Sequence, residues 1–156
     1  MINNNDQVCV ELQSLTFQQV EAYDRDVTNG ETRLYYENCE VTRPTVFRNK
    51  LSGRVGNILK GFDVEITVHG QEFVTSCTCN KTRRTCKHAV ALLYSWIYDG
   101  QDFLDIGKAL KEIENLDKEQ LLHIVQNIIR YNPGLIDIFL AKEKPDWDEI
   151  DADTLQ

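Results

Sequence analysis

Four residues near the middle of the chain have the types and the spacing of a zinc site. Cys77 and Cys79 are separated by one residue, and after a spacer of six residues Cys86 and His88 form a second pair with the same separation. Zn²⁺ prefers thiolate sulfur and imidazole nitrogen, and structural zinc sites are closed by four protein ligands. The sequence therefore predicts one Zn²⁺ bound by Cys77, Cys79, Cys86 and His88.

A purely apolar role and a disulfide are both less well supported for these cysteines. Free cysteines are often buried as small apolar side chains, but residues 75–88 are rich in Lys, Arg and Thr and offer no apolar core. A disulfide would leave one cysteine of the cluster over, and a bridge between residues two apart would be a strained short loop. We therefore favour zinc, whereas Cys9 and Cys39 lack ligand-type neighbours and are expected to be half-buried strand residues.

Alternating apolar residues predict the strands that lead to the first cysteine pair. Residues 62–69 alternate apolar and polar side chains, Gly70 interrupts the pattern, and residues 72–76 read as the returning strand. Side chains two positions apart on a strand point to the same side. Cys77 and Cys79, at the end of the returning strand, can therefore face one ion.

The second pair precedes a helical pattern. Apolar residues recur at steps of three and four from Ala89 to Ile97, and Asp99-Gly100 supplies a stop. Residues two apart on a helix lie about 200° apart around its axis. We therefore expect Cys86 at or before the first turn and His88 just inside it, where the helix N-terminus would also favour a thiolate.

This arrangement resembles the SWIM zinc-finger family, whose pattern is C-x-C, a variable spacer and C-x-H, placed as strand pair, loop and helix. The four predicted ligands match that pattern position by position, and the apolar run 89–93 looks like the helix that follows the histidine in the family. The segment that precedes the ligands in the family, its lead-in, is resembled here by Gly53-Arg54-Val55, Gly61 and the strand from Phe62. The resemblance covers roughly residues 30–98.

SWIM domains occur in Swi/Snf-type helicase-like ATPases, Mu-type transposases, some kinases and recombination accessory proteins. The family is regarded as a DNA- or protein-interaction module. The resemblance therefore implies a zinc-binding module that contacts nucleic acid, a protein partner, or both, as an accessory to a DNA-dependent ATPase or recombination system. The competing expectation is a structural adaptor that zinc stabilises and that binds no nucleic acid.

Charge is distributed unevenly along the chain. The whole chain carries −8, whereas residues 43–87 hold nine Lys/Arg and three Asp/Glu, a net +6, and residues 101–156 hold six and thirteen, a net −7. A basic stretch within an acidic protein can bind nucleic acid. The candidate contacts are Lys81, Arg83, Arg84 and Lys87. These cations could also balance the net −1 of Zn²⁺ with three thiolates, and the two roles are compatible.

The remaining segments are read from periodicity and capping signals. Residues 7–15, 34–41, 46–48 and 51–59 are expected to be strands, and Thr16 is expected to cap a short helix with Gln19. After Gly100 three helices are expected, the second capped by Asp117 with Gln120 and the third begun by Asn132-Pro133. The acidic tail 146–156 is expected to be disordered or a docking peptide.

The predicted fold class is α+β: a small antiparallel sheet with a zinc site at the strand-to-helix junction, followed by a helical extension. The expected domains are a zinc-binding domain (1–100) with a β-rich lead-in, the extension (101–145) and the tail (146–156). We expect DNA, single-stranded or duplex, as a possible partner, and a protein partner through the C-terminal helices.

Catalysis is not expected. The chain contains no G-x-S-x-G, phosphate loop or H-E-x-x-H motif, and four protein ligands would fill the zinc shell, whereas a catalytic zinc keeps a position open. We expect no small-molecule substrate. Since no apolar run is long enough for a membrane span and the N-terminus lacks signal-peptide features, a cytoplasmic protein is expected, or a nuclear one in a eukaryote.

Overall fold

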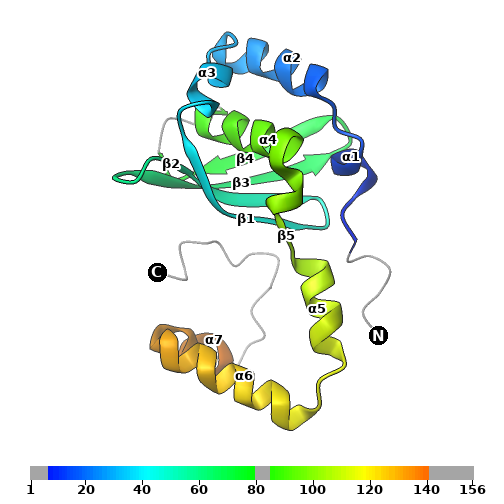
Figure 1. Ribbon diagram of the computed structural model, residues 1–156, viewed down its shortest axis with the longest axis vertical. Coiled ribbons are helices and arrows are strands. Elements are labelled where there is room, and N and C mark those ends of the chain that lie inside the picture. The colour runs from blue at the N-terminus through cyan, green and yellow to red at the C-terminus, as the bar shows by residue number, and fades with distance from the viewer. Residues whose placement is uncertain (1–6, 80–84, 141–156) are drawn as a thin grey trace. The chain divides into compact units, whose positions relative to one another are not determined.

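The computed structural model describes residues 7–79 and 85–140. The chain divides into two compact units, residues 1–111 and 112–156. Unit 1 contains most of the secondary structure, which is coloured along the chain in Figure 1. Its elements are α1 (Val10–Gln13), α2 (Phe17–Thr28), α3 (Thr32–Tyr36), β1 (Glu40–Phe47), β2 (Lys50–Gly56), β3 (Gly61–His69), β4 (Glu72–Cys77), α4 (Lys87–Asp99), the 3₁₀ turn η2 (Gly100–Asp102), β5 (Leu104–Asp105) and the start of α5 (Ile106–Glu114).

Strands β1 to β4 form an antiparallel meander, and the short β5 pairs in parallel with β1, which gives the order β4-β3-β2-β1-β5. The register of β1 shifts between Thr42 and Thr45, where Arg43 has a φ of 51°. Pro44 has no N–H to donate to a ladder, and a bulge is where a strand tolerates it. β1 therefore runs through Arg43-Pro44 instead of ending there.

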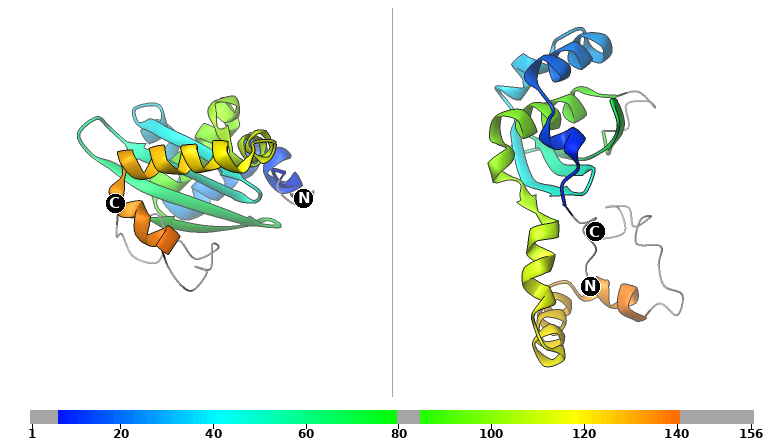
Figure 2. Two further views of the ribbon diagram at one scale, coloured as in Figure 1. Left: turned by 90° about the horizontal axis from the view of Figure 1, so that it is seen from below. Right: turned by 90° about the vertical axis from the view of Figure 1, so that its right-hand side faces the viewer.

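Helix α4 lies between the sheet and the pair α2 and α3, as the views of Figures 1 and 2 show. All residues from His88 to Ser95 are buried, and a helix that is apolar all round belongs in a core. Its neighbours are the inward side chains of the sheet and of α2 and α3. The buried apolar residues are Leu12, Val20, Val46, Leu51, Val55, Val64, Ile66, Val68, Ala89, Val90, Ala91, Leu92, Leu93, Tyr94 and Phe103.

A buried carboxylate joins the helices of this layer. Asp24 of α2 is 1% exposed, and its oxygens accept hydrogen bonds from Tyr94 Oη of α4 at 3.0 Å and from Thr28 Oγ1. The backbone N–H of Thr32, in α3, donates to Asp24 as well at 3.4 Å. Burial and the Asp24 contact raise the pKa of Tyr94. Because a buried charge is tolerated only when it is hydrogen-bonded, this cluster fixes α2, α3 and α4 to one another.

Two strand expectations in the N-terminal third are wrong. Residues 7–15 contain the helix α1, and residues 32–36 form the helix α3. In α1 the apparent alternation does not mark one buried face, since Leu12 is 1% exposed and Val10 is 73% exposed. In α3 the pair Tyr35-Tyr36 packs on side chains of α4, so tertiary contacts outweigh the preference of tyrosine for strands.

Unit 2 contains α6 (Lys118–Tyr131), the 3₁₀ turn η3 (Pro133–Leu135) and α7 (Ile136–Leu140), with no buried side chain in α6 or α7. The capping boxes expected at Thr16/Gln19 and Asp117/Gln120 are both present. The expected tail 146–156 lies outside the described residues. Within the described residues, no helix is long and apolar enough to cross a membrane.

Candidate metal centre

The sheet and α4 bring the four predicted ligands together. One ligand atom each from Cys77, Cys79, Cys86 and His88 lies within 4.8 Å of all the others. His88 Nδ1 is 3.7 Å from Cys77 Sγ and 3.7 Å from Cys86 Sγ. With metal bonds of about 2.3 Å to sulfur and about 2.0 Å to nitrogen, tetrahedral zinc separates its ligand atoms by roughly 3.5–3.8 Å. The donor set and its spacing therefore fit Zn²⁺, with Nδ1 as the imidazole ligand atom.

The first pair is held by the end of the β3–β4 ladder. Cys77 is the last residue of β4 and pairs with Val64. The ladder is continued one residue further, because Thr78 N donates to Asp63 O at 3.0 Å and Asp63 N donates to Thr78 Oγ1 at 2.9 Å. Thr78 is thereby fixed on the strand beside it. Its neighbours Cys77 and Cys79 can then present their sulfur atoms to the same side.

The second pair is held by the start of α4. Cys86 is the N-cap residue, and its carbonyl accepts from Ala89 N at 3.1 Å and Val90 N at 3.3 Å. This placement before the first turn, with His88 inside it, confirms the expectation from the helical pattern. The approach to the helix is fixed by Thr85, whose hydroxyl lies 2.7 Å from Tyr23 Oη and 3.2 Å from Thr75 Oγ1.

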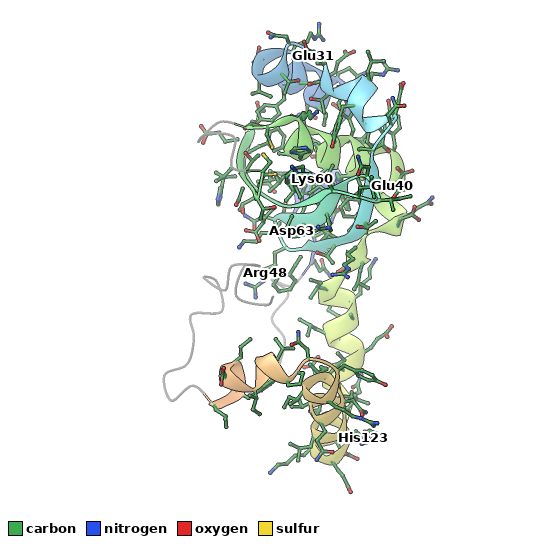
Figure 3. All side chains as sticks on the ribbon, turned by 90° about the vertical axis from the view of Figure 1, so that its left-hand side faces the viewer. Glu31, Glu40, Arg48, Lys60, Asp63 and His123 are labelled. Atoms are coloured by element: carbon green, nitrogen blue, oxygen red, sulfur yellow. The ribbon has the colours of Figure 1, made fainter. Side chains whose placement is uncertain are left out.

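Two aromatic rings enclose the imidazole. His88 is 5% exposed, with the ring of Phe62 at 4.4 Å and that of Tyr35 at 5.5 Å, centroid to centroid. Each ring also carries a cation: Lys60 Nζ lies 5.2 Å from the Phe62 centroid, and Lys87 Nζ lies 4.2 Å from the Tyr35 centroid. We call Tyr35, Lys60, Phe62 and Lys87 the zinc-end rim. Figure 3 shows the side chains here, with sulfur in yellow and Lys60 labelled.

The thiols influence one another strongly. The hydrogen bond with the Cys77 thiol, and then the Ala89 N–H, lower the pKa of Cys86 despite its burial. The contact with Cys86, together with burial, raises the pKa of Cys77. The pKa values of the two thiols are therefore linked through this contact. Since zinc binds thiolates, metal binding replaces thiol protons.

Of the four basic residues predicted as nucleic-acid contacts, only Lys87 lies within the described residues. Its ammonium group lies over Tyr35, whereas Lys81, Arg83 and Arg84 lie outside the described part of the chain. The sequence pattern did not reveal Tyr35, Lys60 and Phe62 as neighbours of the site. Phe62 shared the alternation that predicted the strand, but nothing local indicated that α3 would bring Tyr35 to His88.

The other two cysteines are outside the cluster. Cys9 is the N-cap residue of α1, and Cys39 Sγ donates to Tyr36 O at 3.6 Å. Both are half-buried, as expected, although neither lies in a strand. Burial raises the pKa of each thiol, so both are protonated at neutral pH.

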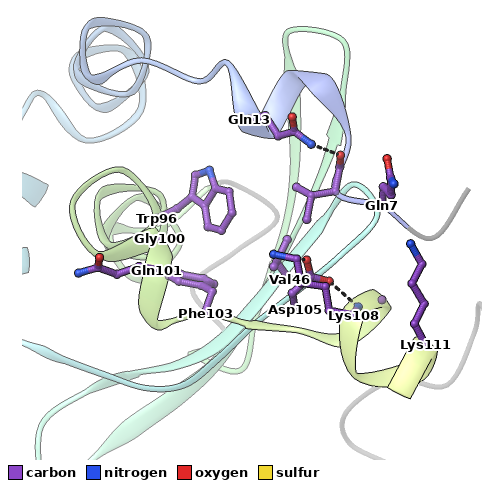
Figure 4. Close-up of a pocket in the computed structure, with 12 residues that line it drawn as sticks. Gln7, Gln13, Val46, Trp96, Gly100, Gln101, Phe103, Asp105, Lys108 and Lys111 are labelled. Carbon is purple, nitrogen blue, oxygen red and sulfur yellow. Dashed lines mark hydrogen bonds and ion pairs between the residues drawn. The ribbon is translucent and has the colours of Figure 1, made fainter. Parts of the chain in front are cut away.

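A cavity of about 400 Å³ adjoins the opposite end of α4 (Figure 4). Its wall includes Trp96, Phe103 and Lys108. Two of its groups are engaged: Trp96 Nε1 donates to Leu12 O at 2.9 Å, and the N–H of Lys108 donates to Asp105 Oδ1 at 3.0 Å. The first interaction joins α4 to α1, and the second is local to the start of α5. The cavity is thus separate from the cysteine cluster.

Comparison with known proteins agrees with the geometry. The family model of the SWIM zinc finger matches residues 60–97, which contain all four predicted ligands. An uncharacterized protein of Methanocaldococcus jannaschii is 32% identical over 97 residues, which are 62% of this chain and 40% of that protein. The chain thus matches less than half of that relative. No solved structure matches. The resemblance to the SWIM family is confirmed, and the match and the Cys/His cluster together identify residues 60–97 as a SWIM-type zinc-finger module.

Proposed function

We propose that this chain is an interaction module whose zinc-end rim contacts nucleic acid, in the service of a DNA-dependent ATPase or recombination system. The observation that carries the proposal is the pairing of cations with aromatic rings around His88, one of the four predicted zinc ligands. Lys87 lies over Tyr35 and Lys60 lies near Phe62. Proteins that bind single strands combine basic groups along the backbone with aromatic rings on which bases stack.

The charge distribution supports the same surface. Residues 43–87 carry a net +6 within a chain of −8, and Lys81, Arg83 and Arg84 belong to the spacer between the two ligand pairs. Each of the three is separated from Cys79 or Cys86, two of the predicted ligands, by only a few positions in the sequence. A local concentration of positive charge attracts phosphate even when the protein as a whole is acidic.

A salt titration with single-stranded and duplex DNA tests the proposal. Each phosphate contact that is lost should flatten the dependence of log affinity on log salt by about 1. We expect Lys87→Ala and Arg84→Ala each to weaken binding to all sequences equally and to flatten the slope. Lys118→Ala, an exposed position of α6, should leave the slope unchanged. Binding that is undetectable at low salt would refute the nucleic-acid role.

The same variants separate phosphate contact from charge balance at the metal. If Lys87 and Arg84 only offset the negative charge of the thiolates, their removal should make zinc easier to strip with a chelator. DNA affinity would then be unaffected. Measuring zinc retention beside DNA affinity therefore distinguishes the two roles in one set of proteins.

A second candidate function is a zinc-stabilised protein adaptor, and the exposed turn between β2 and β3 favours it. Ile58 is 88% exposed and Leu59 95% exposed. The turn is ordered by Asn57, whose side-chain oxygen accepts from Leu59 N at 3.0 Å and Lys60 N at 2.9 Å. Adjacent exposed apolar side chains on a fixed turn are typical of protein contact sites.

The adaptor proposal extends to the C-terminal helices. Several apolar side chains of α6 and α7 are exposed, including Leu122 at 52% and Phe139 at 50%, and amphipathic helices commonly dock in grooves of other proteins. The test is a truncation after Lys111, the last residue of unit 1. This cut keeps β5 and the buried Phe103, which belong to unit 1. A soluble, zinc-bound protein that has lost a protein partner would support docking, whereas aggregation or loss of zinc would refute it.

A further inference from the structure

A groove lies between the first two helices and the β3–β4 hairpin, and its lining contains none of the four cluster residues. Its volume is about 520 Å³. Leu15 and Tyr23 line it from the helical side, and Val68 and Phe73 from the strands. The rings of Tyr23 and Phe73 meet edge to face at 4.8 Å. The groove is thus bounded by helices on one side and strands on the other, and its walls combine apolar and aromatic side chains with polar ones.

The strand beside this groove, β4, is the edge of the sheet, since the order begins with β4 and continues to β3. Thr78 N donates to Asp63 O, and in an antiparallel ladder every second residue repeats that orientation. The backbone groups of Ser76, Val74 and Glu72 therefore face β3. Those of Phe73 and Thr75 face outward.

The outward groups are available in the part of the chain that the structure describes. There, no backbone hydrogen bond beyond the β3 ladder involves Phe73 or Thr75. An unpaired strand edge is a template for another strand, and an extended peptide that adds to such an edge gains main-chain hydrogen bonds together with pockets for alternate side chains. Here the apolar groove adjoins Phe73, so edge and pocket occur together.

Charge selects the kind of peptide. Glu11 and Asp26 line the groove, Glu72 is exposed on β4, and none of the lining residues is a lysine or arginine. Such a rim repels phosphate and attracts cationic side chains. A second copy of this chain is a poor match, because β4 reads Glu72-Phe-Val-Thr-Ser-Cys77 and contains no basic residue.

We infer that β4 and the groove beside α2 bind an extended segment of a partner protein, in which apolar residues and lysine or arginine occupy every second position and so lie on one strand face. The segment adds to the sheet as a further strand on the outward N–H and C=O groups of Phe73 and Thr75. The apolar side chains on that face enter the groove, and the cations on the same face pair with Glu11 and Asp26. The site is distinct in surface and in partner chemistry from the zinc-end rim.

The test uses the full chain and a fluorescent peptide of about the length of β4, with valine and lysine at every second position and threonine at the positions between. The control peptides carry glutamate in place of lysine, or a central proline, which cannot pair as a strand. We expect saturable binding of the first peptide alone. Failure of that peptide to bind, or equal binding of the proline peptide, would overturn the inference.

Charge-reversal variants locate the peptide. Glu11→Lys and Asp26→Lys should each weaken binding by about tenfold, the size expected when an attractive contact becomes repulsive. Glu31→Lys makes the same change in net charge at an exposed position outside the groove, and should change affinity less than about twofold. An equal loss in all three variants would mean that the peptide responds to overall charge, which contradicts a built groove.

Hydrogen exchange identifies the strand and the occupant. Peptide binding should slow exchange of the Phe73 and Thr75 amides. Unchanged exchange with bound peptide would place it elsewhere and overturn the inference. Protection of these amides in a dimer that disappears on dilution would make a second copy the occupant. Displacement of the peptide from the groove by an oligonucleotide would make nucleic acid the occupant, and both results contradict the inference.

Discussion

Helices α4 and α6 are nearly equal in length, but they are stabilised in different ways. α4 has thirteen residues, is buried from His88 to Ser95 and has no side-chain hydrogen bond at its N-cap. α6 has fourteen residues, no buried side chain and a complete capping box at Asp117 and Gln120. The start of α4 is fixed by the cysteine cluster and the core, whereas the start of α6 is fixed by its own sequence. The comparison shows that tertiary contacts can replace a side-chain cap at the start of a helix.

The largest difference between the two helices should appear on zinc removal. Structural zinc contributes on the order of 10 kcal/mol to folding, so a chelator should unfold at least residues 60–98 and leave the helicity of α6 intact. Hydrogen exchange resolved by segment measures both. Cys9→Ser, outside the cluster, is the control and should retain zinc. Unaltered protection of α4 without zinc would contradict the idea that the cluster fixes its start.

Removing the buried hydrogen bond to Asp24 should have the next largest effect. Tyr94→Phe deletes the donor at 3.0 Å from a 1% exposed carboxylate, and a hydrogen bond to a charged group contributes about 1.5–3 kcal/mol. Urea unfolding of unit 1 should show a loss of that size. Tyr98→Phe, at a position 49% exposed, should cost less than about 0.5 kcal/mol. Equal losses would mean that the Asp24 cluster does not hold the helices.

The smallest effects concern the two capping boxes. Thr16→Ala and Asp117→Ala should each cost about 1 kcal/mol. The consequence should differ, because α2 packs on α4 whereas α6 has no buried side chain. Thr16→Ala should lower the unfolding midpoint of unit 1 as a whole. Asp117→Ala should increase hydrogen exchange in the first turn of α6 alone. A loss of stability throughout the protein in this variant would show that α6 is part of a larger core.

The zinc cluster and the elements around it could be predicted from the sequence because their signals are local. The cysteine spacing, the alternation in 62–69 and the helical period after Cys86 each lie within a few residues of the site. Strands β3 and β4, helix α4 and the two capping boxes follow the expectations. The family match over residues 60–97 coincides with this part of the chain.

The parts that sequence reasoning missed depend on distant contacts. Tyr35-Tyr36 have strand propensity, but packing against His88 and Tyr94 selects the helix α3. The two-residue strand β5 exists because it pairs with β1, far earlier in the chain, at Thr45↔Leu104. No local pattern marks such a pairing. The zinc-end rim was missed for the same reason, since Tyr35 reaches His88 from an element far away in sequence.

X-ray absorption spectroscopy at the zinc edge, combined with elemental analysis of the freshly purified, reduced protein, tests the central claim most directly. We predict one zinc per chain with three sulfur neighbours and one nitrogen neighbour. Cys86→Ser should lose the metal or one sulfur neighbour, whereas Cys39→Ser should match the unmodified protein. A sample without zinc, or a metal shell that Cys86→Ser leaves unchanged, would contradict the assignment of Cys77, Cys79, Cys86 and His88 as its ligands.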